Sequence, residues 1–309
     1  MIDIFLQTMP FFMLIAMGYG AARTGFFPQE ANAYLAKFVF YFALSAMLFR
    51  FSANLALDAV LDWRFVFAYL SATMVVYVVA TFVALRRRVP MTEAAVEAQC
   101  AVVGNVGYLG IPMLVLLLGD AAIGPVMMVL LVDLIVFGSL IVILITGARD
   151  GRMSPRILGT VGLGLLKNPM IVSISLGVLA AAGDIPIPVP VNDFLTMLGA
   201  AATPGALFVI GASLASKSAE RLAVAGWLSF CKLIVHPLAC AIAAFFIFDI
   251  APFSAGVMIA AASLPVAGNV YILAQHYGVA PARASATILV STVASVVTVS
   301  LVIAWVTSI

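Results

Sequence analysis

The segment Gly104-Asn105-Val106-Gly107-Tyr108-Leu109-Gly110-Ile111-Pro112 decides the fold, because it places glycine, proline and an amide in the middle of an otherwise apolar stretch. A second phrase of the same kind, Leu264-Pro265-Val266-Ala267-Gly268-Asn269-Val270-Tyr271, occurs in the C-terminal half. Glycine and proline weaken a helix, and the backbone groups that they free must be bonded by protein or water, since lipid cannot bond them. Helices broken at matched positions of two halves are typical of the binding site of a secondary transporter.

The composition is that of a helical membrane protein. Hydrophobic residues make up 65% of the 309 residues, charged residues make up 9%, and the mean hydropathy is +1.21. A soluble domain carries roughly 25% charged residues. The apolar residues fall in successive runs of about 20, the length of a membrane-spanning helix. The net charge of +2 provides no broad basic field, so we expect no nucleic-acid partner.

The reactive residue types argue against several classes of enzyme and pump. Cys100, Cys231 and Cys240 lie inside apolar runs without the spacing of metal ligands, and we expect them to be core residues. The chain has only two histidines, and its Gly-rich stretches lack the lysine pattern of a nucleotide-binding P-loop. We therefore expect a protein that is not an enzyme and that uses no metal and no cofactor.

The apolar runs predict an all-α polytopic membrane protein with ten transmembrane helices in a single membrane domain, 1–309. The predicted spans are 4–22, 32–50, 64–85, 95–118, 123–147, 168–183, 193–215, 222–248, 254–276 and 284–307. The one long polar connection lies between spans five and six. It divides the chain into repeat one (1–147), a cytoplasmic linker (148–167) and repeat two (168–309).

Charges in the short connections predict the orientation. Arg50 and Arg64 lie on one side of the membrane, whereas the odd-numbered connections hold eleven of the 15 Lys and Arg residues. The eleven are Arg23, Arg86, Arg87, Arg88, Arg149, Arg152, Arg156, Lys167, Lys217, Arg221 and Arg283. The positive-inside rule places the odd-numbered connections in the cytoplasm, so both termini are expected outside the cytoplasm.

Spans four and nine, which contain the two quoted phrases, are predicted to run in opposite directions because five spans separate them. A second pair of similar segments supports an internal repeat: Ala46-Met47-Leu48-Phe49 in span two resembles Gly205-Ala206-Leu207-Phe208 in span seven. Two five-helix units of opposite topology are an architecture on which alternating access is commonly built. The sequence therefore predicts an inverted repeat.

Five motifs resemble the auxin efflux carrier family over nearly the whole chain. They are the phrase 104–112, Leu166-Lys167-Asn168-Pro169, Thr203-Pro204-Gly205-Ala206-Leu207-Phe208-Val209-Ile210-Gly211-Ala212-Ser213-Leu214-Ala215, Lys232-Leu233-Ile234-Val235-His236-Pro237 and Leu264-Pro265-Val266-Ala267-Gly268-Asn269. The nearest branch is the bacterial malonate-transporter-like one, because the long hydrophilic loop that the plant carriers insert between their halves is absent.

This resemblance implies an architecture and a class of substrate. The fold would be that of bile-acid and sodium/proton carriers, with two inverted five-helix repeats and crossed broken helices four and nine. Helices 1, 2, 6 and 7 would form a scaffold part, and helices 3–5 and 8–10 a transport part that moves past it as an elevator. Small organic carboxylates are the implied substrates, and a homodimer is the expected assembly.

Asn105 and Asn269 are the leading candidates for substrate binding. A neutral amide offers two donors and an acceptor, so it can bind a carboxylate without the cost of a buried charge, and the free N–H groups at the starts of the half-helices favour an anion there. Alternatively, the amides only cap the broken helices or bridge neighbouring helices. The other candidates at the breaks are Gly104 and Gly268, Tyr108 and Tyr271 as residues that close the pocket or pack between helices, and Pro112 and Pro265 as residues that shape the breaks.

Asp133 is the one acidic residue well inside a predicted span, flanked by Leu130-Leu131-Val132 and Leu134-Ile135-Val136. Ionisable groups at that depth are costly and usually serve transport. Asp133 is therefore a candidate carrier of a proton or ligand of a coupling cation, or else a structural residue bonded to a neighbouring helix. The resemblance implies a polar residue of span five at the substrate site, which Asp133 matches, and Ser45 in span two as a further site residue.

Lys232 and His236 complete the candidates for coupling. They lie one helical turn apart in span eight and therefore on the same face. Lys232 could pair with Asp133, neutralise a substrate carboxylate, or extend to the cytoplasmic edge of the membrane. His236 precedes Pro237 and is either a packed histidine or part of a proton relay.

These observations predict a secondary active transporter of small organic carboxylates, with malonate or a similar dicarboxylate as the substrate and possible symport with a proton or sodium ion. We expect it to be an integral protein of a bacterial inner membrane, surrounded by lipid. The alternatives are a sodium-coupled carrier of larger organic anions, and a membrane receptor or sensor that uses the same pocket without net transport.

Overall fold

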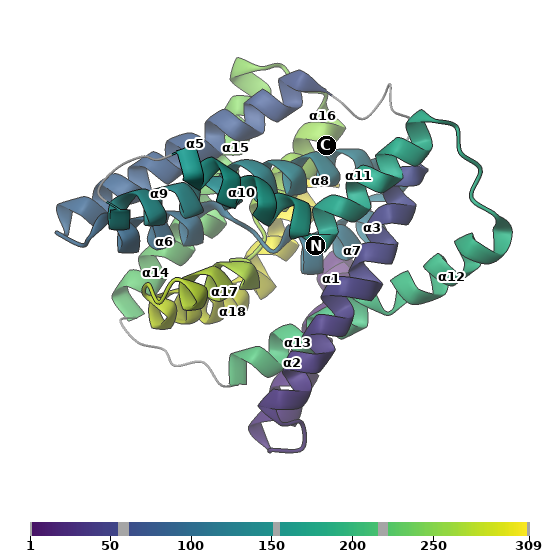
Figure 1. Ribbon diagram of the computed structural model, residues 1–309, viewed down its shortest axis with the longest axis horizontal. Coiled ribbons are helices and arrows are strands. Elements are labelled where there is room, and N and C mark those ends of the chain that lie inside the picture. Colours follow the sequence, from purple (N-terminus) through teal and green to yellow (C-terminus); the bar gives the residue numbers. More distant parts are fainter. Residues whose placement is uncertain (1, 55–61, 151–154, 216–221, 308–309) are drawn as a thin grey trace.

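The computed structural model describes residues 2–54, 62–150, 155–215 and 222–307, and within these ranges every regular element is a helix (Figure 1). The helices of the N-terminal half are α1 (Ile2–Arg23), α2 (Gln29–Phe38), η1 (Val39–Ala43), α3 (Leu44–Ala53), α5 (Trp63–Arg86), α6 (Met91–Val102), η2 (Val106–Gly110), α7 (Ile111–Leu118), η3 (Asp120–Ala122), α8 (Ile123–Val132), η4 (Asp133–Phe137) and α9 (Gly138–Asp150).

The C-terminal half likewise consists of consecutive helices. Its helices are α10 (Pro155–Lys167), α11 (Pro169–Ala182), α12 (Val189–Ala200), α13 (Ala202–Ala215), α14 (Leu222–Phe230), η5 (Cys231–Val235), α15 (His236–Ile242), η6 (Ala243–Ile247), α16 (Pro252–Ala262), α17 (Gly268–His276) and α18 (Pro281–Val306). The structure thus confirms an all-helical, polytopic membrane protein.

Six continuous helical stretches within the described residues are long and apolar enough to cross a membrane. They are Gln29–Ala53, Trp63–Arg86, Asp120–Arg149, Val189–Ala215, Leu222–Ile247 and Pro281–Val306. The bent pair Ile157–Lys167 and Pro169–Ala182 makes a seventh candidate if it is one span. Val106–Leu118 and Pro252–Ala262 are apolar but shorter, because the spans to which we assign them are broken. The count of ten spans and the inverted repeat remain predictions.

Much of the predicted linker, 148–167, is helical. Helix α10 covers its C-terminal part and meets α11 at a bend of 69°. Asn168 forms this bend, since its side-chain Oδ1 accepts a hydrogen bond from the backbone N–H of Met170 at 3.0 Å and Pro169 begins the next helix. Asparagine at the N-cap and proline at the first helical position are a standard start of a helix.

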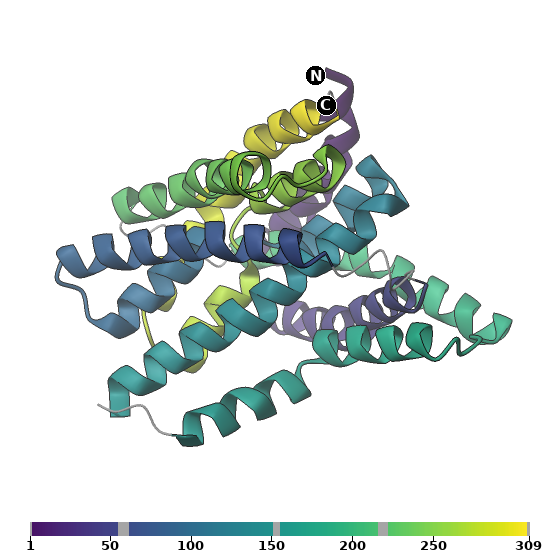
Figure 2. The same cartoon turned by 90° about the horizontal axis from the view of Figure 1, so that it is seen from above.

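The helices pack in two neighbourhoods. In the first, α1 runs along α13 and α3 runs along α11, with α2 and α12 beside them (Figure 1). In the second, α5 packs on α6 and α15, α14 packs on α18, and α9 packs on α6. The hydroxyl groups of Thr8 and Ser300 share a hydrogen bond of 2.9 Å, so the N-terminal part of α1 lies beside the C-terminal part of α18 (Figure 2).

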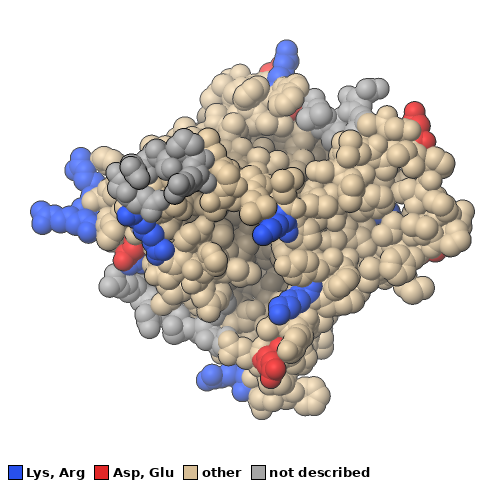
Figure 3. Space-filling model, in the orientation of Figure 1, with Lys and Arg blue, Asp and Glu red and all other residues tan. Residues whose placement is uncertain are grey.

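The outer surface is poor in charge. The face in Figure 3 is mostly uncharged, and its lysines and arginines stand as separate groups. Many large apolar side chains are exposed on the protein surface, for example Phe26, Leu116 and Phe246, as expected for residues that face lipid. Three residues used to predict the orientation, Arg152, Lys217 and Arg221, lie outside the described residues.

The α1–α13 pair requires glycine at its closest approach. A Cβ added to Gly211 would lie 1.8 Å from the carbonyl oxygen of Ile15, and one added to Gly18 would lie 2.1 Å from the carbonyl oxygen of Phe208. Small residues allow membrane helices to bring their backbones together in this way. Neither neighbouring atom can move without separating the two helices, because both belong to the backbone.

We expect Gly211→Val to destabilise the protein by about 2 kcal/mol or more through overpacking, measured as a fall in the melting temperature of detergent-solubilised protein. Gly20→Val is the control, because Gly20 lies in α1, the partner helix of Gly211, and has nothing within 4 Å of the added Cβ. Equal melting temperatures for the two variants would show that α1 and α13 do not pack at this distance.

Candidate functional site

The two broken spans cross each other at their breaks. The connection between α6 and η2 and the connection between α16 and α17 run antiparallel, with Gly104 paired to Val266. The N–H of Asn105 donates to the carbonyl of Pro265 at 2.8 Å, and the N–H of Ala267 donates to the carbonyl of Val103 at 3.1 Å. The breaks therefore satisfy one another's backbone groups, which the interior of a membrane requires.

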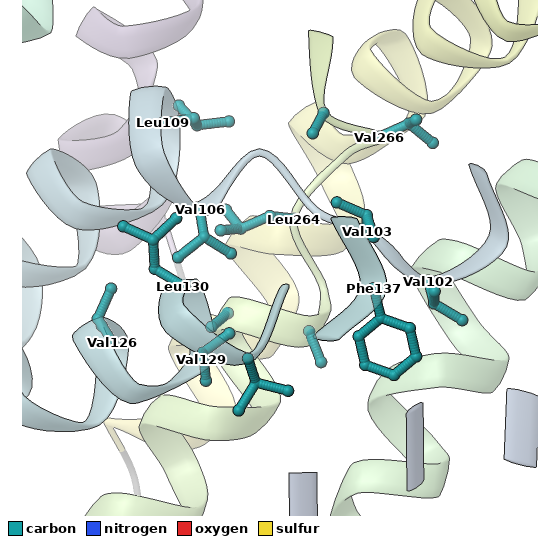
Figure 4. Close-up of a cluster of buried hydrophobic side chains, with 14 of the residues drawn as sticks. Val102, Val103, Val106, Leu109, Val126, Val129, Leu130, Phe137, Leu264 and Val266 are labelled. Atoms are coloured by element: carbon teal, nitrogen blue, oxygen red, sulfur yellow. The ribbon is translucent and has the colours of Figure 1, made fainter. Parts of the chain in front are cut away.

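Apolar side chains surround this crossing and fix it in place. Figure 4 shows Val103 and Val106 from one break close to Leu264 and Val266 from the other, with Val129 and Leu130 of α8 and Phe137 of η4 around them. All of these side chains are buried. The N–H of Val266 also donates to Ser291 Oγ of α18 at 3.1 Å. The extended segments thus lie inside the protein and not against lipid.

The two amides lie beside this crossing. Asn105 is 5% exposed, and its carbonyl accepts hydrogen bonds from the N–H groups of Leu109 and Gly110, so its backbone begins η2. Asn269 is half-buried in the first turn of α17. Its Oδ1 atom is buried and makes no hydrogen bond with the described part of the chain. A buried amide oxygen without a partner is costly, and this is a feature of a site that binds another group.

Asp133 faces the crossing from η4. Its side chain is buried, its Oδ1 accepts a hydrogen bond from the Tyr69 hydroxyl at 2.8 Å, and the carboxyl lies within reach of the Gly104 backbone. Its Oδ2 makes no hydrogen bond with any described residue. The carboxyl therefore lies next to the break that carries Asn105, with one oxygen atom still able to bind a proton or a cation.

Lys232 reaches the same place from η5. Its side chain is fully buried, and its ammonium group donates to the carbonyl of Ala262, just before the second break. A Cβ added to Gly104 would lie 3.2 Å from the Lys232 Nζ, so glycine at this position leaves room for the ammonium group. Of the three alternatives for Lys232, extension to the cytoplasmic edge does not fit its full burial. The charges of Lys232 and Asp133 interact, but no direct ion pair within 4 Å joins them among the described residues.

His236 joins this cluster from the next turn. Its Nδ1 lies 3.2 Å from Lys232 Nζ, and its Nε2 lies 2.9 Å from the hydroxyl oxygen of Thr73. The predicted position of Lys232 and His236 on one helix face is confirmed. We call Tyr69, Thr73, Asp133, Lys232 and His236 the polar cluster; all five side chains are at least 97% buried. Such a set inside a membrane domain is unusual, because buried ionisable groups are expensive there.

The comparisons with known proteins agree with this geometry. Residues 3–303 match the family described as "Membrane transport protein". The chain belongs to this membrane transport protein family. It is also 32% identical over 298 residues, covering 94% of this chain and 92% of the relative, to a protein of Rhizobium meliloti (strain 1021) named "Putative malonate transporter".

Membership of the membrane transport protein family confirms the resemblance to auxin efflux carriers. It identifies the chain as a membrane-embedded transporter and not an enzyme, and it implies a small-molecule substrate. Intramembrane ionisable residues usually mark a solute or ion path, so the crossing and the polar cluster form the candidate site.

Tyr69 and Thr73 are members of the polar cluster that the sequence analysis missed. They lie one turn apart in α5, and Tyr77 follows after another turn, so polar residues recur at every fourth position of an apolar span. That spacing, which places all three on one helix face, was the available signal. In this chain α5 thus contributes hydrogen-bond partners for both Asp133 and His236.

The remaining predicted site residues make contacts of other kinds. The Ser45 hydroxyl donates to the carbonyl of Phe40 in its own helix, while the Phe40 ring stacks on Tyr108, with ring centres 6.4 Å apart. Tyr108 therefore lies between η2 and η1. Tyr271 is half-buried against the core. Of the helix-breaking residues, Pro265 takes part in the crossing through its carbonyl, whereas Pro112 lies in the first turn of α7.

π-Helical turns occur where the candidate residues lie. Asp133 is the first residue of η4, Lys232 is the second residue of η5, and η2 directly follows Asn105. A π-turn inserts an extra residue in a helix and is frequent at functional sites. Asp133 and Lys232 are buried together with most of their neighbours in the chain, so these two π-turns lie in the core.

A second buried charged group, the carboxyl of Glu97, lies in α6, and the sequence analysis did not identify it. The Glu97 side chain is fully buried and forms ion pairs with Arg87 and Arg283, and Arg283 also pairs with Glu93 at 3.0 Å. Glu97 lies near the start of the predicted span 95–118, so it is a second buried acidic residue besides Asp133. Arg87 and Arg283, which we counted as signals of orientation, also make structural contacts: Arg87 joins the end of α5 to α6, and Arg283 joins α6 to the start of α18.

Proposed function

We propose that this protein is a secondary active transporter of small organic carboxylates, with malonate or a similar dicarboxylate as its substrate. One observation carries the proposal: the breaks of two spans cross between two amides, next to a buried carboxyl and a buried ammonium group. The name of the Rhizobium meliloti relative supports malonate as the first substrate to test.

The charges around the crossing suit an anion. The N-terminal ends of η2 and α17 begin at the breaks, and free N–H groups at helix starts attract negative charge. The Asn269 Oδ1 atom lacks a hydrogen-bond donor. A protonated carboxyl group of the substrate, or a water molecule of its hydration shell, would supply one. Lys232 offsets part of the negative charge that a carboxylate would bring beside Asp133.

Alternating access would move the crossing relative to a scaffold. In this proposal α1, α2, α3, α11, α12 and α13 form the scaffold, and the helices that hold the crossing and the polar cluster form the moving part. Tyr108, stacked on Phe40, would lie at the sliding surface between the two. The odd-numbered connections would face the cytoplasm of a bacterial cell, and two copies would form a dimer.

Asp133 would couple transport to a proton or a sodium ion. Its Oδ2 has no hydrogen-bond partner among the described residues, so it can bind a cation when the anion enters. Bringing a second negative charge to this carboxyl is costly without such a cation. Symport of an anion with a proton or sodium ion follows from this electrostatic requirement.

Uptake into proteoliposomes tests the proposal. Purified protein in vesicles should accumulate labelled malonate when a proton or sodium gradient is applied, and unlabelled malonate should compete with it. Binding of malonate without any uptake would favour a receptor or sensor. Sodium-dependent uptake of larger organic anions, with malonate excluded, would favour the alternative carrier.

Asn105→Ala and Asn269→Ala should each lower the affinity for malonate at least tenfold, which corresponds to about 1.4 kcal/mol for one lost charge-assisted contact. The backbone bonds of the crossing remain in both variants, because they use N–H and C=O groups only. Competition binding in detergent measures the change, and the melting temperature without substrate serves as the folding control. Unchanged affinity in both variants would remove the amides from the site.

A further inference from the structure

Helix α10 presents an apolar face that no other part of the described structure covers. Leu158 is 67% exposed and Leu166 is 75% exposed. They are eight residues apart and therefore lie about 80° apart around the helix, which is within the width of one apolar stripe. Ile157, on another side, is buried and holds α10 against its neighbours α9 and α11. The exposed leucines thus form a separate surface.

The position of α10 along the chain indicates where this surface lies relative to the membrane. The stretch Asp120–Arg149 has 30 residues, which at 1.5 Å per residue is roughly 45 Å long, the full thickness of a bilayer with its headgroups. Its end at Arg149 must therefore lie near the headgroups. Helix α10 begins at Pro155, a few residues later, and so begins at the same surface of the membrane.

The bend and the charges agree with this location. Because α11 continues at 69° to α10, the two helices are not one straight span. Four basic residues lie in α10 or shortly before it in the sequence: Arg149, Arg152, Arg156 and Lys167. Asp150 is the one acidic residue between 148 and 167. Basic residues at such a position interact favourably with anionic headgroups.

We propose that α10 is an interfacial helix that inserts Leu158 and Leu166 into the lipid leaflet on the side of the linker, at the boundary between headgroups and acyl chains. An amphipathic helix binds membranes in this way when its apolar face can enter the leaflet and its polar face remains in water. The partner of this surface is therefore lipid. The segment that joins the two halves of the chain is anchored to the membrane and is not a free cytoplasmic loop.

Single cysteines labelled with an environment-sensitive fluorophore test the proposal in the full-length protein. Leu158→Cys and Leu166→Cys probe the apolar face. Lys167→Cys is the matched control, because residue 167 lies about half a turn away from Leu158 around the helix and is exposed. The native Cys100, Cys231 and Cys240 are buried, so the unchanged protein should take up little label. An unchanged melting temperature shows that each variant is folded.

In vesicles, labels at 158 and 166 should emit at shorter wavelength than the label at 167, and lipids with a quencher at a shallow acyl position should quench them. Aqueous iodide should quench the label at 167 several-fold more strongly. Equal iodide quenching at all three positions would overturn the proposal, and so would strongest quenching by lipids labelled at the bilayer centre. Emission that changes when the protein is diluted with excess lipid would overturn it too, because a second copy of the chain would then cover the face.

Discussion

Asp133→Asn should abolish gradient-driven accumulation of substrate while leaving substrate binding intact. Asparagine keeps the size of a protonated aspartic acid and can still accept the hydrogen bond from the Tyr69 hydroxyl that Asp133 Oδ1 accepts at 2.8 Å, but it can neither ionise nor release a proton. Binding should strengthen if anything, because the repulsion between two carboxylates is gone. Counterflow exchange, which needs no net ion movement, should persist. Proteoliposome uptake with and without an ion gradient measures both activities.

Tyr69→Phe is the matched control for this experiment. It removes the hydroxyl that bonds Asp133 but keeps the carboxyl, so accumulation should survive at a reduced rate. Normal accumulation by Asp133→Asn would contradict a coupling role and leave Asp133 as a structural residue. Loss of exchange as well as accumulation would point to a substrate-binding role or a folding defect, which the melting temperature separates.

Glu97→Gln should be the most destabilising of the conservative changes that we predict. Glu97 is fully buried between Arg87 and Arg283, and the Arg283 side chain is itself 8% exposed. Removing one partner of a buried ion pair leaves an uncompensated charge, which costs about 3–5 kcal/mol; because the Arg87 side chain is 34% exposed, we expect about 3 kcal/mol here. The melting temperature of the purified protein and its yield in the membrane fraction measure the effect.

Glu93→Gln provides the comparison. Glu93 also pairs with Arg283, but its side chain is 33% exposed, so this change should cost less than about 1 kcal/mol. The double variant Glu97→Gln/Arg283→Gln should recover part of the lost stability, since it removes the unpaired buried cation. Similar melting temperatures for Glu97→Gln and Glu93→Gln would show that the buried pairs do not hold α6 to α18.

The sequence determined the features that depend on local chemistry. The apolar runs and the low charge content specify membrane helices, because a continuous apolar run of about 20 residues has the length of a helix that crosses lipid and bonds its own backbone groups. The breaks near Asn105 and Pro265 follow from glycine and proline, which weaken a helix whatever surrounds it. The spacing of Lys232 and His236 likewise predicted their contact, because residues four apart in a helix are neighbours.

The tertiary structure alone decided which side chains meet. In a membrane protein the lipid-facing residues are as apolar as the core, so the polar spacing in α5 marks one helix face but does not reveal that this face meets Asp133. The partners of Glu97 come from different helices, and Arg87 and Arg283 looked like surface charges in the sequence. The carbonyl of Ala262 that binds Lys232 belongs to the backbone, which carries no sequence signal. Long-range packing determines these contacts, because a buried charge is stable only where other segments supply its partners.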